Sequence, residues 1–424
     1  MSVSSPLPTR GRWVRRGSGI VLLPPRGPAL EAEAGWTGEA EAEADRTPLL
    51  VPHFHVRRAV PGGALSPAGG APQGMAPSGM NPGFVSAADE LVVNTGANGL
   101  HTRLRELMGK KYAAQSGRMK VALVDLTGSR LYGPDLAGWN STVMLYGAST
   151  PKICALYGAR QLGFDLQALA RRDSIQKKDA LVAAARKAWA AAGLASRAQP
   201  AVEELFDFAE SSGKTVAVTA SAKLQTLVGC TFADNCNWAA SLLIDRVGHG
   251  FINSALWQAG LFHPRRGGLW TRTLYGTGGS CCYPRDRLQK PVVTAPAPPS
   301  FKGSVPYQSV SALSLATFFT LMAQGRLASD AVSGRLRADL QPACSFFGGF
   351  HLSCKPTFTP PTKCGTWGGF VHDGILIQRP TGSGCGGKQI RYVVALLTQG
   401  LSGAETIFKP FLTDVDALIL ANNP

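Results

Sequence analysis

The stretch YGASTPKI, residues 146–153, decides how the fold of this 424-residue chain is predicted. It opens a helix, because the residues that follow repeat apolar side chains three and four positions apart, on one helix face. Ser149 or Thr150 is expected to cap this helix, with the proline in its first turn. One helical turn then places Lys152 over Ser149. A lysine that packing desolvates can lose its proton near neutral pH and remove the proton of the serine hydroxyl.

Ser-x-x-Lys is a weak signal by itself, because the same pattern recurs at Ser174 and Ser211. Ser174 lies in a run of charged residues that is typical of a solvated face, and Ser211 lies in a Ser- and Gly-containing segment that is typical of a loop. Only Ser149 opens a helix with an apolar face. The alternative for Ser149 is a serine that merely caps a helix, so further motifs must decide.

The order of segments around this helix predicts an α+β protein. A helix over residues 100–114 leads into two extended pieces, 119–126 and 129–132, which are expected to form a β-hairpin. Residues 163–260 show helical periodicity over most of their length and predict an all-helical subdomain. Residues 311–324 give the most regular helix, and Gly325 is expected to end it.

Three further extended segments, 362–367, 374–378 and 390–397, precede a closing helix at 404–420. Because strands come first, then helices, then strands again, the late strands are expected to pair with the early hairpin. The predicted fold is therefore an antiparallel β-sheet flanked by helices, with the helical subdomain beside it.

Composition excludes several classes of protein. The chain is 45% hydrophobic, enough for a large core, yet no apolar run approaches the roughly eighteen residues that span a bilayer. Residues 1–90 hold eight arginines and eight acidic residues, so the net charge of +16 belongs entirely to residues 91–424. Such a surplus favours anionic partners, such as a cell-envelope polymer or a carboxylate substrate. Nucleic acid is not predicted, because aromatic residues do not interleave the basic clusters.

Residues 1–90 are predicted to be a low-complexity, disordered extension of the domain at 91–424, because Gly, Pro and alternating acids dominate them. Arginines precede the apolar piece at residues 20–23, as in a signal peptide. Pro24 and Pro25 end this piece too early, so the sequence gives no clear export signal.

The nine cysteines predict no metal site, because they include no Cys-x-x-Cys pair and no histidine at ligand spacing. Two readings stay open for them: disulfides such as Cys230–Cys236 or Cys344–Cys354 in an exported protein, or buried thiols. The glycine-rich run 382–388 resembles a phosphate loop, but a strand follows it where a helix would be needed. No cofactor is predicted.

Two more motifs follow Ser149 and Lys152 in order: Asn-Cys-Asn at residues 235–237, followed by Ala-Ala-Ser-Leu-Leu, and Lys-Cys-Gly-Thr at 363–366 on a predicted strand. Together the three resemble the Ser-x-x-Lys, Ser-x-Asn and Lys-Thr-Gly motifs of the penicillin-recognising serine hydrolases, the superfamily of serine β-lactamases and D,D-peptidases. The resemblance covers about residues 95–424 and is closest to class A β-lactamases.

This resemblance implies a role for each matching residue. Ser149 would be the acylated nucleophile and Lys152 its general base. Asn237 would hold a substrate amide, Lys363 would supply a positive field, and Thr366 would offer its hydroxyl to a substrate carboxylate. The backbone N–H groups of Ser149 and Thr366 would form the oxyanion hole.

The sequence also departs from the family pattern. Asn235 stands where the family has a serine, and an amide cannot relay a proton to a leaving nitrogen. Cys364 replaces the usual threonine, whereas Gly365 fits a strand that substrate must approach closely. No glutamate lies between Glu210 and Glu405, so the deacylating glutamate of class A β-lactamases has no counterpart.

The resemblance thus predicts a serine hydrolase of β-lactamase type, which forms an acyl-enzyme on Ser149 with β-lactam or related amide substrates, outside the cytoplasm. One alternative is a D-alanyl-D-alanine carboxypeptidase or an esterase on the same fold, with a D-amino-acid peptide as substrate. Another is a catalytically impaired module that binds cell-wall peptides.

Overall fold

The computed structural model describes residue 96 and residues 99–191, 199–263, 267–271, 274–275, 308–348, 352–382 and 385–424, with the backbone of three short strands before them. It separates into two compact units, Met1–Thr47 and Pro48–Pro424. In the first unit, β1 (Trp13–Arg16) and β2 (Gly19–Leu22) form an antiparallel hairpin. The rest of the predicted extension at 1–90 lies outside the described residues, and the division at residue 90 stays a prediction.

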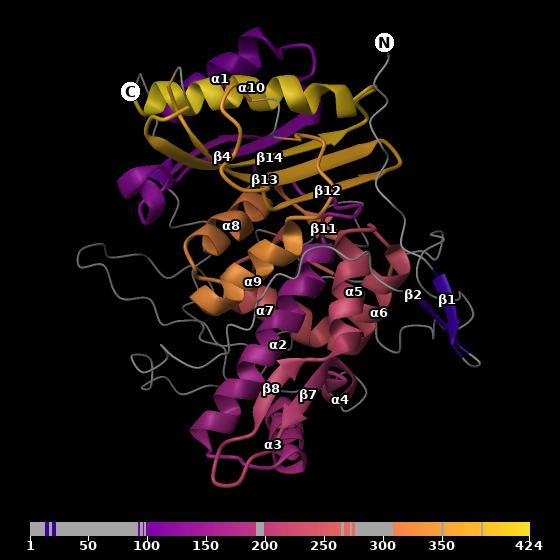
Figure 1. Cartoon of the computed structure of the whole chain (residues 1–424). Helices are drawn as coiled ribbons and strands as arrows, with labels where there is room; N and C mark the ends of the chain where they lie inside the picture. Colours follow the sequence, from indigo (N-terminus) through magenta and orange to yellow (C-terminus); the bar gives the residue numbers. More distant parts are fainter. Residues whose placement is uncertain are drawn as a thin grey trace, which may run out of the picture. The chain divides into compact units, whose positions relative to one another are not determined.

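A six-stranded sheet organises the second unit (Figure 1). In spatial order its strands are β12 (Thr362–Trp367), β13 (Phe370–Pro380), β14 (Gln389–Gln399), β4 (Met119–Asp125), β5 (Asp135–Trp139) and β3 (Val92–Val93). All neighbours run antiparallel except β3, which runs parallel to β5. The predicted pairing of late strands with the early hairpin is therefore confirmed, through β14 and β4.

Helices cover both faces of this sheet (Figure 1). On one face lie α1 (Leu100–Lys110) and α10 (Glu405–Asn422); on the other lies α8 (Ala312–Ala323), followed in the chain by α9 (Asp330–Leu340). Because side chains alternate along a strand, Val121 and Leu123 of β4 pack with α1 and α10, whereas Ala122 and Val124 pack with α8. Burial on both faces explains why residues 121–124, the middle of β4, are all apolar.

The helical subdomain begins with a long helix that crosses it. Its helices are α2 (Lys152–Arg172), α3 (Lys178–Ala191), α4 (Val202–Leu205), α5 (Ala222–Phe232), α6 (Asn237–Val247) and α7 (His249–Gln258). The subdomain is not purely helical, since β7 (Phe206–Ala209) and β8 (Ala217–Ala220) form a hairpin within it. These strands are only four residues long, too short for a clear alternating pattern.

Short pairs of strands connect the subdomain to the sheet. Before α8, β6 (Leu145–Tyr146) pairs with β11 (Ser309–Val310), and β9 (Phe262–His263) pairs with β10 (Gly267–Gly268). Ser311 caps α8 through a reciprocal capping box with Ser314, and Gly325 follows the helix at a φ of +72°. The predicted helix at 311–324 is thus confirmed with both of its ends.

Two local predictions were wrong. Residues 129–132 do not form a strand: Gly128, at a φ of +59°, opens the 3₁₀ turn Gly128–Leu131, and β5 is the partner of β4 instead. Neither Ser149 nor Thr150 caps α2, because Pro151 holds the N-cap position and the Thr150 hydroxyl donates to the carbonyl of Gly147.

The structure pairs cysteines differently from either suggested bridge. Cys344 bonds to Cys364 and Cys354 bonds to Cys385, at sequence separations of 20 and 31. Cys236 is disulfide-bonded to a residue other than Cys230, so the suggested Cys230–Cys236 bridge is wrong. Among the described residues, no helix is long and apolar enough to cross a membrane, and no group of His, Cys, Asp and Glu is arranged to hold a metal ion.

Candidate active site

Ser149 lies in the turn that leads into α2. The turn is tight: the Thr150 amide donates to the Gly147 carbonyl over 3.0 Å, and Ala148 adopts a φ of +48°. A positive φ is costly for a residue with a Cβ, and such strain gathers at functional sites. The Ser149 side chain is half-buried, and its hydroxyl has no hydrogen-bond partner among the described residues. It is therefore a serine held at a strained corner with its hydroxyl uncommitted.

Lys152 is fully buried at the first position of α2. Its Nζ donates to the backbone oxygen of Asn235 over 2.9 Å and to Asn235 Oδ1 over 3.1 Å, and lies 5.2 Å from the centre of the Tyr275 ring. Burial, and then the nearby charge of Lys363, lower the pKa of Lys152 to about 6. Above that pH its amine is neutral and can accept a proton.

Asn235 joins Lys152 to Lys363. Besides the bond from Lys152, its Oδ1 accepts one from Lys363 Nζ over 3.2 Å, so a single amide oxygen receives both lysines. Asn235 has a φ of +52°, a conformation that asparagine tolerates better than most residues. Its side chain is exposed, whereas both lysines beneath it are buried. Thus Asn235 is the solvent-facing member of a three-residue bridge.

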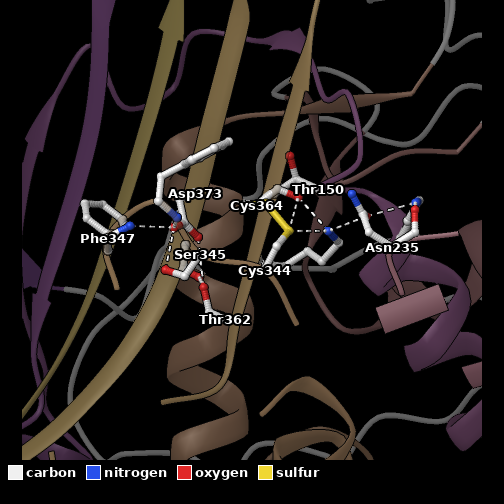
Figure 2. The surroundings of a disulfide bond; sticks show 12 residues. Thr150, Asn235, Cys344, Ser345, Phe347, Thr362, Cys364 and Asp373 are labelled. Carbon is white, nitrogen blue, oxygen red and sulfur yellow. Dashed lines mark hydrogen bonds between the residues drawn. A yellow bond between two sulfur atoms is a disulfide. The ribbon is translucent and has the colours of Figure 1, made fainter. Parts of the chain in front are cut away.

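Lys363 lies in β12 and is fully buried. Its Nζ also donates to the Cys364 carbonyl over 2.6 Å and lies 3.4 Å from Cys344 Sγ (Figure 2). Burial lowers the pKa of Lys363 to about 7, although the Asp373 carboxylate opposes this shift. Near neutral pH, Lys363 therefore exists in both charged and neutral forms.

Gly365 brings β12 against the serine turn. A Cβ at this position would lie 2.6 Å from the Ser149 amide nitrogen and 2.8 Å from that of Thr150. No real side chain tolerates such contacts with backbone, so only glycine lets the strand and the turn approach this closely. The close approach at Gly365 is thus made by the serine turn, and an approach of substrate to this strand stays a prediction.

A buried carboxylate, Asp373 of β13, binds the residues that follow Cys344 of the Cys344–Cys364 disulfide (Figure 2). It accepts hydrogen bonds from the Ser345 hydroxyl over 2.7 Å, the Phe346 amide over 2.6 Å, the Phe347 amide over 3.1 Å and the Thr362 hydroxyl over 2.9 Å. Burial raises the pKa of Asp373 to about 6, although these hydrogen bonds lower it. Asp373 thus ties residues 345–347 to the sheet.

Sequence patterns gave no sign of Asp373 or Tyr275, and they offered Cys344 only as a partner of Cys354. Asp373 lies just before the predicted strand at 374–378 and has no motif partner, and Cys344 and its actual partner Cys364 are 20 residues apart. Tyr275 follows α7 in a segment without periodicity, and nothing but its aromatic character distinguished it.

The structure describes the other two residues predicted for the site but does not connect their side chains to the serine or the two lysines by hydrogen bonds. Asn237 is the first residue of α6 and is half-buried, and Thr366 is an exposed residue of β12. Within the described part of the chain, no hydrogen bond joins either side chain to Ser149, Lys152 or Lys363. Their substrate contacts remain predictions.

No model of a known protein family matches the sequence, and no curated protein matches it. Several solved structures are similar to the chain. PBP-A is 16% identical, over 77% of this chain and 97% of its own, with a TM-score of 0.41. A class A β-lactamase from Bacteroides cellulosilyticus DSM 14838 is 11% identical, over 77% and 99%, with a TM-score of 0.42. A β-lactamase from Sphaerobacter thermophilus DSM 20745 is 18% identical, over 76% and 97%, with a TM-score of 0.42.

Proposed function

We propose that this protein is a serine hydrolase of the penicillin-recognising type, which forms an acyl-enzyme on Ser149 with a β-lactam or a related acyl donor. One observation carries the proposal: Asn235 Oδ1 accepts hydrogen bonds from both Lys152 and Lys363. These three residues come from three motifs far apart in the sequence, and a chance Ser-x-x-Lys would not bring them together.

In the proposed reaction, neutral Lys152 removes the Ser149 proton while Ser149 Oγ attacks the acyl carbon. The lowered pKa of Lys152 supports this role, because a base must be unprotonated at the working pH. The negative charge that develops on the acyl oxygen is stabilised by the N–H groups of Ser149 and Thr366. Each such donor contributes about 3 to 4 kcal/mol to transition-state stabilisation. Gly365 leaves the Ser149 amide uncovered for this purpose.

A second function, that of a D,D-peptidase or slow acyl acceptor, is favoured by the missing glutamate. No glutamate lies between Glu210 and Glu405, so the chain lacks the family residue that activates the deacylating water. Under this alternative the same acyl-enzyme forms but persists. A binding module would form no adduct at all.

We further propose that the protein works outside the cytoplasm. Disulfides form and persist in oxidising compartments, and the structure has the bonds Cys344–Cys364 and Cys354–Cys385. The basic charge of residues 91–424 suits an anionic cell-envelope polymer as a neighbour.

Intact-protein mass spectrometry tests the proposed nucleophile. The full chain and a Ser149→Ala variant are incubated with benzylpenicillin and followed over time, with peptide mapping of any adduct. We expect one equivalent bound to Ser149 and none in the variant. Rapid decay of the adduct would indicate a β-lactamase, and persistence would indicate the peptidase-like alternative. An adduct on another residue, or equal labelling of the variant, would contradict the assignment.

A further inference from the structure

The bridge of two lysines and one asparagine contains a base but no proton donor for a leaving group. Asn235 Oδ1 and its backbone oxygen only accept hydrogen bonds from Lys152. The remaining amide N–H groups of Asn235 donate hydrogen bonds but do not ionise near neutral pH. The proton that Lys152 takes from Ser149 is thus directed to a residue that cannot pass it on.

Lys363 does not fill this gap. An ammonium has three N–H donors, and Lys363 Nζ has three neighbouring acceptors: Asn235 Oδ1 at 3.2 Å, the Cys364 carbonyl at 2.6 Å and Cys344 Sγ at 3.4 Å. All three donors are used within the protein. Tyr275 contacts Lys152 through its ring, whose centre lies 5.2 Å from Lys152 Nζ, and among the described residues no hydrogen bond joins its hydroxyl to either lysine.

The third motif has also lost a hydroxyl. Cys364 occupies the middle position, and its sulfur is bonded to Cys344. A disulfide has no hydrogen to donate, whereas a hydroxyl at this position could donate to a substrate. Both departures remove a protic group from the strand and loop that surround the lysines.

We propose that this site acts on acyl donors whose leaving group departs as a stable anion, such as aryl esters, in preference to amides and β-lactams. The inference rests on the proposed function and names the substrate class of that same site. Activation of Ser149 is retained, because Lys152 is buried and held, whereas the three described residues of the bridge offer the leaving group no proton.

The reaction balances without a proton donor. Ser149 Oγ forms a bond to the acyl carbon, its proton moves to Lys152 Nζ, and the carbonyl electron pair moves to oxygen. When that pair returns, the bond to the aryl oxygen breaks and its electrons leave with the phenolate. An amide nitrogen would instead have to gain a proton as its bond to carbon breaks.

A leaving-group series on the full-length wild-type chain provides the first test. Ser149 acylation is measured by mass spectrometry with p-nitrophenyl acetate, phenyl acetate and benzylpenicillin. We expect the rate to fall steeply from the nitrophenyl to the phenyl ester, and to be lowest for benzylpenicillin. Equal rates for the two esters, or acylation by benzylpenicillin as fast as by p-nitrophenyl acetate, would overturn the inference.

Asn235→Ser provides the second test, because it restores a hydroxyl between the two lysines. We expect the ratio of benzylpenicillin to p-nitrophenyl acetate rate constants to rise about a hundredfold, the lower range of what general acid catalysis contributes. Asn140→Ser is the matched control: Asn140 is also exposed, with a φ of +49° against +52° for Asn235, so both changes place serine in the same strained conformation. The control should leave the ratio unchanged.

The outcomes separate this inference from the proposed function. If none of the three probes labels Ser149, the proposed function fails and the inference with it. If Ser149 is labelled but its rate does not depend on the leaving group, only the inference fails. Should Asn235→Ser not fold, as judged by circular dichroism, the wild-type series still decides.

Discussion

Lys152 is the residue whose protonation controls the proposed reaction. Below a pH of about 6 its amine holds a proton and cannot accept another, so the rate of Ser149 acylation should rise as the pH increases through this value. With an anionic acyl donor, the rate should fall again above about 7, where Lys363 loses its charge. A pH profile of acylation with benzylpenicillin checks both limbs, and a flat profile between pH 5 and 8 would contradict the assignment.

The pH profile of a Lys363→Met variant tests the coupling between the two lysines. Because the charge of Lys363 lowers the pKa of Lys152, its removal should shift the rising limb to higher pH. Lys388→Met is the control, since Lys388 is an exposed lysine outside the three motifs. A rising limb at the same pH in both variants would mean that the lysines do not interact.

Gly365 gives a steric prediction at the same scale. An alanine there would press its Cβ against the Ser149 amide nitrogen, at 2.6 Å in the present geometry, and would cover one of the proposed oxyanion donors. We expect Gly365→Ala to slow acylation by about 100-fold or more, the usual effect of losing such a donor. Gly334→Ala in α9, where no atom lies within 4 Å of the added Cβ, should leave the rate unchanged.

Among the elements, β12 is joined to residue 344 by the Cys344–Cys364 disulfide and by a hydrogen bond from the Cys364 amide to the Cys344 carbonyl. Replacing Cys344 and Cys364 by serine should cost about 2 to 4 kcal/mol of stability and should also slow acylation, because Lys363 loses its sulfur neighbour. The Cys354–Cys385 disulfide closes a loop of similar length, so replacing these two cysteines by serine should cost a similar amount of stability. Chemical unfolding measures the stability of the two double variants, and mass spectrometry measures their rates of Ser149 acylation. An equal loss of activity in both double variants would show that the disulfide near Lys363 has a purely structural effect.

The sequence predicted elements well where periodicity is long. The helix at 311–324 and the strands at 362–367 and 390–397 were confirmed nearly to the residue, because both their cores and their ends carry signals. The prediction of a strand at 129–132 was wrong, because a turn that begins at Gly128 can have the same composition as a short strand. Short elements hold too few residues for a pattern to emerge.

Pairings between distant residues could not be predicted. The three motifs pointed to Lys152, Asn235 and Lys363 separately. Only the tertiary structure brings both lysines to the same side-chain oxygen of Asn235, which accepts a hydrogen bond from each. The disulfide partners were likewise wrong, since cysteine spacing does not determine connectivity. Asp373 has no local signal, because its four donors come from β12 and from residues 345–347.

For the molecule as a whole, a buried ion pair attaches the last helix to the sheet. Arg379 of β13 donates from Nε to Asp416 Oδ1 of α10 over 2.8 Å, and the Tyr392 hydroxyl donates to the same oxygen over 2.7 Å. Arg379→Met would leave the Asp416 charge buried without its partner, which costs about 3 to 5 kcal/mol. Thermal unfolding should show this loss, and Arg379→Met combined with Asp416→Leu should regain most of it. No recovery in the double variant would mean that the charge pair itself stabilises the fold.

The central position of β14 has a consequence for how the protein is made. During synthesis β4 leaves the ribosome well before its partner β14, because the whole helical subdomain lies between them in the sequence. Until β14 has been synthesised, the backbone N–H and C=O groups along one edge of β4 have no partner strand. Such an unpaired edge makes the nascent chain prone to aggregation and dependent on chaperones. The helices α2 to α7 contact one another locally and can form first. Because β12 approaches Ser149 as part of the sheet, the proposed nucleophile acquires its surroundings only after the helical subdomain has been synthesised.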